Sequence, residues 1–258
     1  MPSLLCVSAH PDDGIICMGG SLALLSRRGV HLTIVCTTRG EGGEMGNPPV
    51  CRPEELGAVR VQEEHCSAAV LGVQQVLFLD YVDPRPAPDG SLLPAAADPQ
   101  EFELQIVRLL RRLRPDVVVT HGSTGEYGHP QHLATNRAVT AAFFSAGDPA
   151  RFAGLGLAPY RPRQLYYFAA AAPPGGYFSI FRNPNDPPTL SVDIAPVLDL
   201  KHRAFACHAT QIATTLKDAH LRSMEGMFPP REAFHRRYPE EQLPDDLLAA
   251  LATPSPVG

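Results

Sequence analysis

Short hydrophobic runs alternate with longer amphipathic stretches through the N-terminal half of the chain. The short runs predict strands over residues 4–9, 31–37, 76–80 and 116–121. Apolar residues at helical spacing predict helices over 18–28, 54–71 and 100–113, and Pro130 is placed to begin a fourth helix. Each crossover is long enough for a βαβ unit, so we expect a doubly wound, mostly parallel α/β fold.

The pattern is looser beyond residue 160. It predicts strands over 164–169 and 189–194, and helices over 196–210 and 216–226. Stretches rich in proline and glycine predict loops over 84–99 and 173–188. No linker or repeat divides the chain. We therefore expect a single domain over 1–250, with a Rossmann-like sheet in the strand order 3-2-1-4-5, helices on both faces, and a disordered tail over 251–258.

Composition narrows the function classes. The 258 residues are 44% hydrophobic, which is enough to bury a core without disulfides. A net charge of −5 without a dense basic run argues against nucleic acid and polybasic membrane binding. No apolar run reaches about 18 residues and no leader pattern precedes the first strand, so we expect a cytoplasmic protein. The six cysteines form no CxxC pair, and we interpret them as buried free thiols without a catalytic role.

Two polar segments carry candidate chemistry. His10-Pro11-Asp12-Asp13 follows the first predicted strand, and His129-Pro130-Gln131-His132 begins the helix after the fourth. In the expected sheet these strands are neighbours, and ligands bind at the carboxyl ends beside such a reversal of strand order. Either segment alone is ordinary, because HxxH is frequent on helices and Pro-Asp-Asp is a common turn. Their expected convergence favours a functional site. We interpret the other histidines as structural or exposed, and note that His121 ends the fourth predicted strand.

The residue types in these segments suit metal-dependent hydrolysis. His10, Asp13 and His132 together make a two-histidine, one-carboxylate set that leaves a coordination position open, as catalytic zinc requires. Fe²⁺ or another divalent metal suits the same set. A remaining carboxylate and imidazole would serve as general base and as acid or oxyanion stabiliser. Motifs for dinucleotide binding, a P-loop and a serine nucleophile elbow are absent from the sequence.

At this point the chain resembles the PIG-L/LmbE-like family of metal-dependent N-acetylglucosaminide deacetylases, which includes the bacillithiol and mycothiol types. The two segments carry the resemblance. Further matches extend it over about residues 3–212 and are Gly40-Glu41-Gly42, Arg60, Asp83 and Lys201-x-x-Ala204-x-x-x-His208-x-x-Gln211.

The resemblance implies a role for each matched residue. The implied metal ligands are His10, Asp13 and His132. Asp12 matches the general base, His129 the general acid or electrostatic stabiliser, and Tyr127 a tyrosine that helps to hold the tetrahedral intermediate. The implied substrate-binding residues are Arg60, Asp83 and His208. Gln131 replaces the aspartate of the usual HPDH motif, and a carboxylate there would favour a protonated His129.

The resemblance predicts a zinc-dependent hydrolase that removes the N-acetyl group from a GlcNAc conjugate and releases acetate. The expected substrate is a thiol precursor such as GlcNAc-malate or GlcNAc-inositol. A thiol-conjugate amidase and a chitooligosaccharide or glycopeptide deacetylase are alternatives within the family. A non-catalytic sugar- or metal-binding protein and a two-metal phosphoesterase are alternatives from other classes. The resemblance also implies a homo-oligomer, a hexamer or smaller, and a small-molecule partner.

Overall fold

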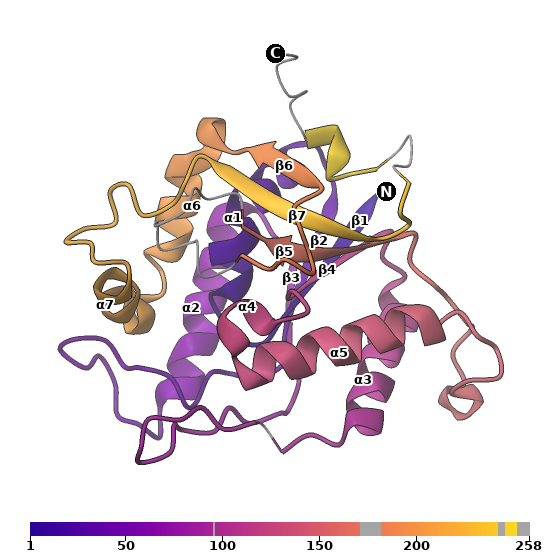
Figure 1. Cartoon of the computed structure of the whole chain (residues 1–258), viewed down its shortest axis with the longest axis horizontal. Coiled ribbons are helices and arrows are strands. Elements are labelled where there is room, and N and C mark those ends of the chain that lie inside the picture. Colours follow the sequence, from indigo (N-terminus) through magenta and orange to yellow (C-terminus); the bar gives the residue numbers. More distant parts are fainter. Residues whose placement is uncertain (95, 171–181, 242–245, 252–258) are drawn as a thin grey trace.

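A seven-stranded sheet runs through the computed structural model (Figure 1), which describes residues 1–94, 96–170, 182–241 and 246–251. Its strands in chain order are β1 (Ser3–Ser8), β2 (His31–Cys36), β3 (Gln75–Phe78), β4 (Val117–Thr120), β5 (Gln164–Ala169), β6 (Leu190–Asp193) and β7 (Arg231–Tyr238). The spatial order is β3-β2-β1-β4-β5-β7-β6. The pairings from β3 to β5 are parallel, which confirms the predicted order 3-2-1-4-5.

β7 is the strand that the sequence pattern did not predict. It pairs antiparallel with both β5 and β6 and so separates them. Its charged residues obscure the strand pattern, but two of them are buried or partly buried in ion pairs. Glu232 lies 2.6 Å from Lys201 Nζ, and Arg236 lies 3.1 Å from Asp246. Charges that are paired in this way can occupy a central strand.

The observed helices confirm most of the predicted ones, but several begin or end at residues other than those predicted. They are α1 (Asp13–Arg27), α2 (Leu56–Leu71), α3 (Pro99–Leu113), α4 (Gly125–Gly128), α5 (Pro130–Ser145), α6 (Leu198–Phe205) and α7 (Ala209–Asp218). Single 3₁₀ turns lie at Ala153–Leu155, Ala195–Val197 and Ala249–Leu251. α1 begins earlier than predicted because the Asp12 carbonyl accepts the first helical N–H groups, and its backbone departs from helical angles at Met18.

The C-terminal helices were placed wrongly. The predicted helices 196–210 and 216–226 are instead α6 and α7, and the chain turns between them at residues 206–208. The predicted loop over 84–99 is confirmed over 84–94 and 96–98. Of the other predicted loop, residues 182–188 are confirmed and 173–181 lie outside the described residues. Most of the expected tail, 252–258, also lies outside them, and Leu251 is buried in the last 3₁₀ turn.

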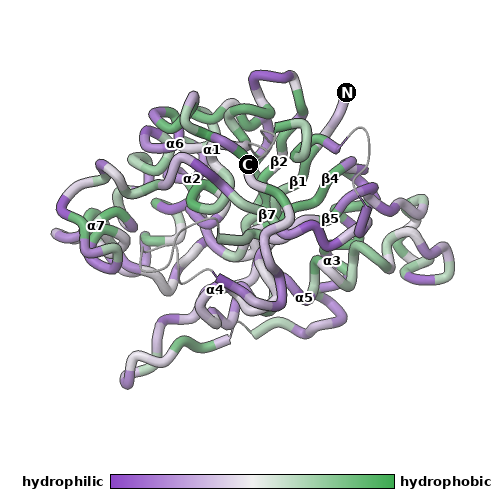
Figure 2. Tube along the Cα trace, turned by 45° about the horizontal axis from the view of Figure 1, so that its top comes forward, coloured by the Kyte–Doolittle hydropathy of each residue, from purple (hydrophilic) through white to green (hydrophobic). Residues whose placement is uncertain are grey.

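Alternate residues of the central strands face two hydrophobic layers. Leu4 and Cys6 of β1 pack on one side with Ile15, Leu22 and Phe205 of α1 and α6. Leu5 and Val7 pack on the other side with residues of α3 and α5, such as Ile106 and Phe143. Figure 2 shows the central strands as the hydrophobic interior of the molecule. This two-sided burial explains why the parallel strands are continuous apolar runs.

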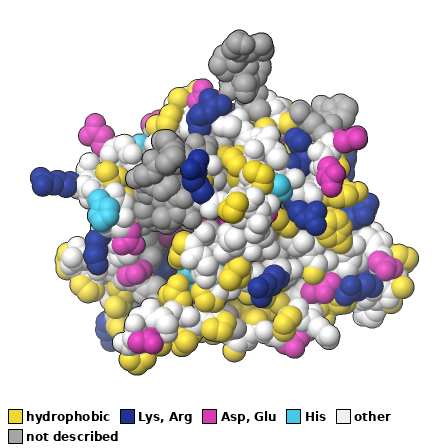
Figure 3. Space-filling model, viewed as in Figure 1, with side chains coloured by type: hydrophobic (Ala, Val, Ile, Leu, Met, Phe, Trp, Pro, Cys, Tyr) yellow, Lys and Arg dark blue, Asp and Glu magenta, His cyan; other side chains and the backbone are white. Residues whose placement is uncertain are grey.

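The surface carries mixed charge. On the face drawn in Figure 3, the basic side chains of the described residues are interspersed with acidic ones. None of the helices in the described part of the chain is long and apolar enough to cross a bilayer.

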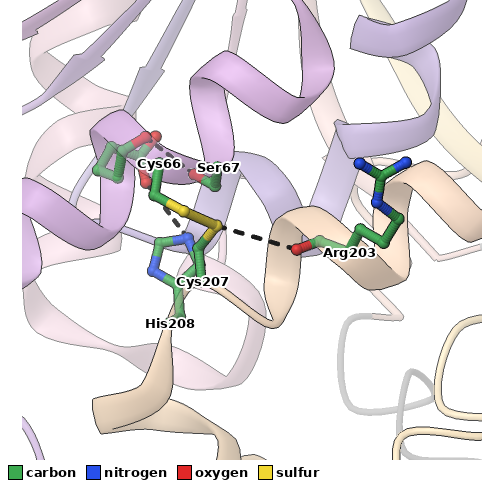
Figure 4. The surroundings of a disulfide bond; sticks show 6 residues. Cys66, Ser67, Arg203, Cys207 and His208 are labelled. Carbon is green, nitrogen blue, oxygen red and sulfur yellow. Dashed lines mark hydrogen bonds and ion pairs between the residues drawn. A yellow bond between two sulfur atoms is a disulfide. The ribbon is translucent and has the colours of Figure 1, made fainter.

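Two cysteines correct the expectation that all six are free thiols. Cys66 on α2 and Cys207, just before α7, form a disulfide across 141 residues (Figure 4). The remaining four are free, and of these only Cys6 and Cys36 are fully buried. The sequence spacing hid the pair because only the folded chain brings the end of α6 against α2. The disulfide therefore tethers the start of α7 to α2.

Candidate active site

A cavity of about 170 Å³ opens where the predicted segments meet. β1 and β4 are paired neighbours, so the loops after them lie side by side at one edge of the sheet. Eight of the nine predicted site residues line the cavity, and they are His10, Asp12, Asp13, Arg60, Asp83, Tyr127, His129 and His132. The convergence expected from the strand order is therefore confirmed.

Three side chains that line this cavity, His10, Asp13 and His132, form a compact triangle of donor groups. His10 Nδ1 lies 3.3 Å from His132 Nε2. Asp13 lies beside both of these nitrogens, with its Oδ2 3.4 Å from His10 Nδ1 and its Oδ1 3.4 Å from His132 Nε2. Four donors arranged tetrahedrally about zinc at 2.0–2.1 Å are about 3.3 Å apart. The two imidazole nitrogens are therefore spaced like two donors of such a tetrahedron, and each has an Asp13 oxygen at a similar distance.

Hydrogen bonds on the far side of each imidazole leave the inner nitrogens free to bind a metal. His10 Nε2 lies 3.3 Å from Asp83, and His132 Nδ1 lies 2.7 Å from Glu126. A carboxylate accepts the proton of the nitrogen that it faces, so the lone pairs point into the triangle. Burial would raise the pKa of Asp13, but the surrounding histidines hold it well below its usual range. These groups could hold a divalent cation.

Asp12 lies beside the triangle in a strained backbone conformation. Its φ is 103°, in the left-handed region that non-glycine residues rarely occupy. Its N–H donates to Glu64 at 3.1 Å, and its carboxylate lies 3.3 Å from Arg60 Nη2. Burial raises the pKa of Asp12 to about 7, although Arg60 opposes this. A carboxyl group with this pKa suits proton transfer near neutral pH.

Arg60 is held by the protein itself. Its guanidinium donates to the carbonyl oxygens of Pro11 at 2.5 Å and Gly40 at 3.2 Å, and only 3% of the residue is exposed. Gly40 has a φ of +67°, and a Cβ there would lie 2.3 Å from the guanidinium. The Gly-Glu-Gly loop therefore makes room for Arg60, which supports the backbone and carboxylate around Asp12.

His129 caps the N-terminus of α5. Its Nδ1 accepts the N–H of Gln131 at 3.3 Å, so that nitrogen carries no proton. Burial, with the nearby histidines, lowers the pKa of His129 to about 3. The side-chain amide of Gln131 does not contact His129 but donates to Asp83 at 2.9 Å and to the Leu93 carbonyl at 3.0 Å. His129 is therefore a neutral imidazole whose proton is on Nε2.

Tyr127 and Asp83 border the same space. Tyr127 is 54% exposed, and its ring lies edge-on to those of His129 and His132, with centroids 5.7 and 5.6 Å away. Asp83 is buried and faces both His10 and Gln131. Asp83 thus touches the donor triangle through His10 while also lining the cavity.

Comparison with known proteins identifies the family. Residues 5–143 match the model of a family described as GlcNAc-PI de-N-acetylase, PIG-L. The chain belongs to the PIG-L family. A 1D-myo-inositol 2-acetamido-2-deoxy-alpha-D-glucopyranoside deacetylase of Thermobifida fusca (strain YX) is 33% identical over 243 residues, covering 81% of this chain and 83% of that relative.

Solved structures share this PIG-L fold. GalB, the 4-carboxy-2-hydroxymuconate hydratase of Pseudomonas putida KT2440, matches with a TM-score of 0.68 and 22% identity, over 94% of this chain and 99% of its own. N,N'-diacetylchitobiose deacetylase from Pyrococcus horikoshii matches with a TM-score of 0.65 and 23% identity, over 91% of this chain and 83% of its own. At these identities the likeness shows the fold alone, and proteins with different activities share it.

The ninth predicted residue is not among those that line the cavity of this PIG-L protein. His208 is fully buried, and its Nε2 lies 3.7 Å from Glu64. Four residues of the following helix, α7, line the cavity in its place, and they are Gln211, Thr214, Thr215 and Asp218. Glu63 on α2 accepts both the N–H and the hydroxyl of Thr210, so α7 is anchored on α2 beside the disulfide.

Sequence reasoning missed two glutamates of the site. Glu64 receives the Asp12 N–H, and Glu126 contacts both His121 and His132. Glu64 follows Arg60 by one helical turn, and this spacing does not signal its partner 52 residues away. Glu126 lies only five and six residues from His121 and His132, but these spacings do not by themselves indicate contact. His121, which directly follows β4, has both ring nitrogens engaged, because its Nδ1 faces Glu126 and its Nε2 accepts the Ala9 N–H at 2.9 Å.

Proposed function

We propose that this protein is a metal-dependent hydrolase that removes the N-acetyl group from a GlcNAc-inositol conjugate and releases acetate. The observation that carries the proposal is the triangle of His10, Asp13 and His132 with the Asp12 carboxylate beside it. Membership of the PIG-L family and the names of its relatives support the same chemistry.

We assign His10, Asp13 and His132 as the metal ligands and zinc as the metal. Two imidazoles and one carboxylate suit zinc and leave a position open, and Fe²⁺ has similar ligand preferences. When bound, the cation supplies a Lewis acid that polarises the amide carbonyl and eases deprotonation of water. His129 also brings a nitrogen within 4.8 Å of the two histidines. The Nδ1 of His129, however, accepts the Gln131 N–H, so we do not assign His129 as a metal ligand.

Asp12 acts as the base and then as the acid of the reaction. It accepts a proton from water as the water oxygen forms a bond to the acetyl carbon. When the C–N bond breaks, the same proton passes to the departing amine, so the products are acetate and a free amino sugar. A pKa raised by burial to about 7 lets Asp12 hold and release a proton in one cycle. Arg60 and Glu64 keep its carboxylate and backbone in place.

His129 and Tyr127 stabilise the developing oxyanion. Because the Nδ1 of His129 accepts a backbone N–H, its Nε2–H is the group available to donate. Neutral His129 therefore serves as a hydrogen-bond donor, which favours electrostatic stabilisation over proton donation among the two roles that the sequence left open. The ring of Tyr127 lies beside that of His129, so its hydroxyl can reach the same region.

The charges of the cavity favour a neutral polyol as the rest of the substrate. Among the described residues that line it, Arg60 is the one lysine or arginine, and it faces Asp12. Glu44 and Asp218 add negative charge at the exposed rim. A malate carboxylate would meet these anions without a free cation to pair with, whereas inositol hydroxyls can donate to them. Asp83 and Arg60 remain our candidates for sugar contacts.

Acetate release from a panel of substrates tests the proposal. The panel contains GlcNAc-inositol, GlcNAc-malate, diacetylchitobiose and a thiol-conjugate amide, each with zinc-loaded and chelator-treated protein. We expect the highest kcat/KM for GlcNAc-inositol, loss of activity on chelation, and recovery with zinc. Zinc-loaded protein that releases no acetate from any substrate, or chelated protein that remains fully active, would refute the proposal.

The single domain over 1–250, the cytoplasmic location and the homo-oligomer stay predictions from the sequence.

A further inference from the structure

Glu126 is a buried carboxylate whose two oxygens are both occupied. One oxygen lies 2.8 Å from His121 Nδ1 and 2.7 Å from His132 Nδ1. The other accepts the N–H of Gly122 at 2.9 Å. Only 2% of its side chain is exposed, although it is among the residues that line the cavity. The carboxylate therefore has little capacity left for a substrate and instead faces the protein.

The protons of the two imidazoles can be placed from these contacts. His121 Nε2 accepts the Ala9 N–H, so the proton of the neutral ring is on Nδ1 and points at Glu126. His132 presents the same nitrogen to the same oxygen, and the two rings stack with centroids 4.0 Å apart. One carboxylate thus sets the tautomer and the orientation of both rings.

The backbone around Glu126 is strained. Its φ of 59° and ψ of −82° are not helical, although it lies within α4. Gly125 precedes it with a φ of +62°, and a Cβ there would lie 2.9 Å from Leu133 and 3.2 Å from His132. Strained residues persist where surrounding contacts over-determine them, and such positions concentrate at functional sites. Here the contacts that hold Glu126 are those with the two histidines and Gly122.

We propose that Glu126 is a positioning residue for metal binding, which presents the Nε2 lone pair of His132 to the cation and uses His121 as a stacked support for that ring. The inference rests on the proposed function, since it takes His132 to be a metal ligand. It assigns no contact with substrate to Glu126. Asp83 faces the far nitrogen of His10 in the same way, at the longer distance of 3.3 Å.

Zinc affinity of E126Q tests the proposal without reference to a substrate. Glutamine has the same shape but lacks the charge, and its amide N–H₂ would face the Gly122 N–H. We expect zinc affinity, measured by chelator competition, to fall roughly 10- to 100-fold. After kcat is corrected for the fraction of E126Q protein that lacks zinc, we also expect kcat to fall by a larger factor than KM changes. Affinity within threefold of the wild type would overturn the proposal.

E232Q is the matched control. Glu232 is also buried, and its carboxylate likewise accepts from three donors, Gly20 N, Ser21 N and Lys201 Nζ. It contacts none of the proposed ligands, so E232Q should lower Tm and leave zinc affinity unchanged. An equal loss of zinc affinity in both variants would show a general effect of buried charge and would overturn the specific role of Glu126.

A measurement on the unmodified protein keeps the proposal falsifiable if E126Q does not fold. In zinc-loaded, ¹⁵N-histidine-labelled protein, we expect His132 to bind zinc through Nε2 and to show a slowly exchanging Nδ1–H. Zinc bound through Nδ1 would overturn the proposal. A wild-type protein that binds no zinc would instead refute the proposed function, so the two failures are distinguishable.

Discussion

Glu64 accepts the backbone N–H of Asp12 at 3.1 Å, although 52 residues separate them along the chain. Glu64 is 1% exposed, and its burial raises its pKa from the ordinary 4.5 to about 8, assisted by the nearby aspartates. The residue that supports the proposed base is therefore itself a carboxyl group that resists ionisation.

This relationship predicts a pH-dependent stability. Because the pKa of Glu64 is higher in the folded than in the unfolded protein, its protonation stabilises the fold. This contribution to the free energy of unfolding is complete below pH 4.5 and is lost as the pH rises to about 8. Relative to E64Q, metal-free wild-type protein should lose about 1.4 kcal/mol for each pH unit in that window. Denaturant unfolding of both proteins from pH 4 to 9 measures the difference. Curves that stay parallel over this range would show that Glu64 does not titrate as described.

Asp12→Asn should separate catalysis from metal binding. Asparagine tolerates the positive φ of this position and keeps the backbone N–H that Glu64 accepts. We expect bound zinc to be unchanged and kcat to fall by about 10² to 10⁴. His10→Ala should instead lose zinc. Metal analysis and acetate release on both variants decide the matter, and an active Asp12→Asn enzyme would exclude Asp12 as the base.

Gly40→Ala should displace the Arg60 guanidinium and so lower activity more than it lowers stability. The new Cβ would meet the guanidinium, which is the far end of a flexible chain and can be displaced. Gly29→Ala is the matched control, because Gly29 also has a positive φ but has nothing within 4 Å of an added Cβ. Both variants should lose about 1–2 kcal/mol of stability from backbone strain. Only Gly40→Ala should lower kcat, and equal kcat values would argue against the support that Arg60 gives to Asp12.

Cys66→Ser should loosen one wall of the cavity. The disulfide to Cys207 closes a 141-residue separation, so its removal should cost about 2–4 kcal/mol. Because α7 lines the cavity, we expect KM to rise more than kcat falls. Cys51→Ser removes a free thiol and should change neither value. Reductant should destabilise the wild type but not Cys66→Ser, and a wild type that is insensitive to reductant would contradict the tether.

The sequence by itself determined the architecture as far as β5 and the location of the site. Hydrophobic periodicity is a local property, so it predicted the parallel strands, and their order then brought His10 and His132 together from segments 122 residues apart. The resemblance to the PIG-L family named nine site residues, and all of them except His208 line the cavity.

Only the tertiary structure decided which contacts hold and orient the side chains of the site. The strand β7, the Cys66–Cys207 disulfide and the contact of Glu64 with Asp12 all depend on groups that are distant in sequence. The partners of Glu126 are near in sequence, but only the folded backbone turns them toward its carboxylate. A buried polar or charged group is stable only when a partner satisfies it, and no local pattern encodes which partner that is. The same reason applies to His129, whose neutral state follows from its burial and from the Gln131 N–H.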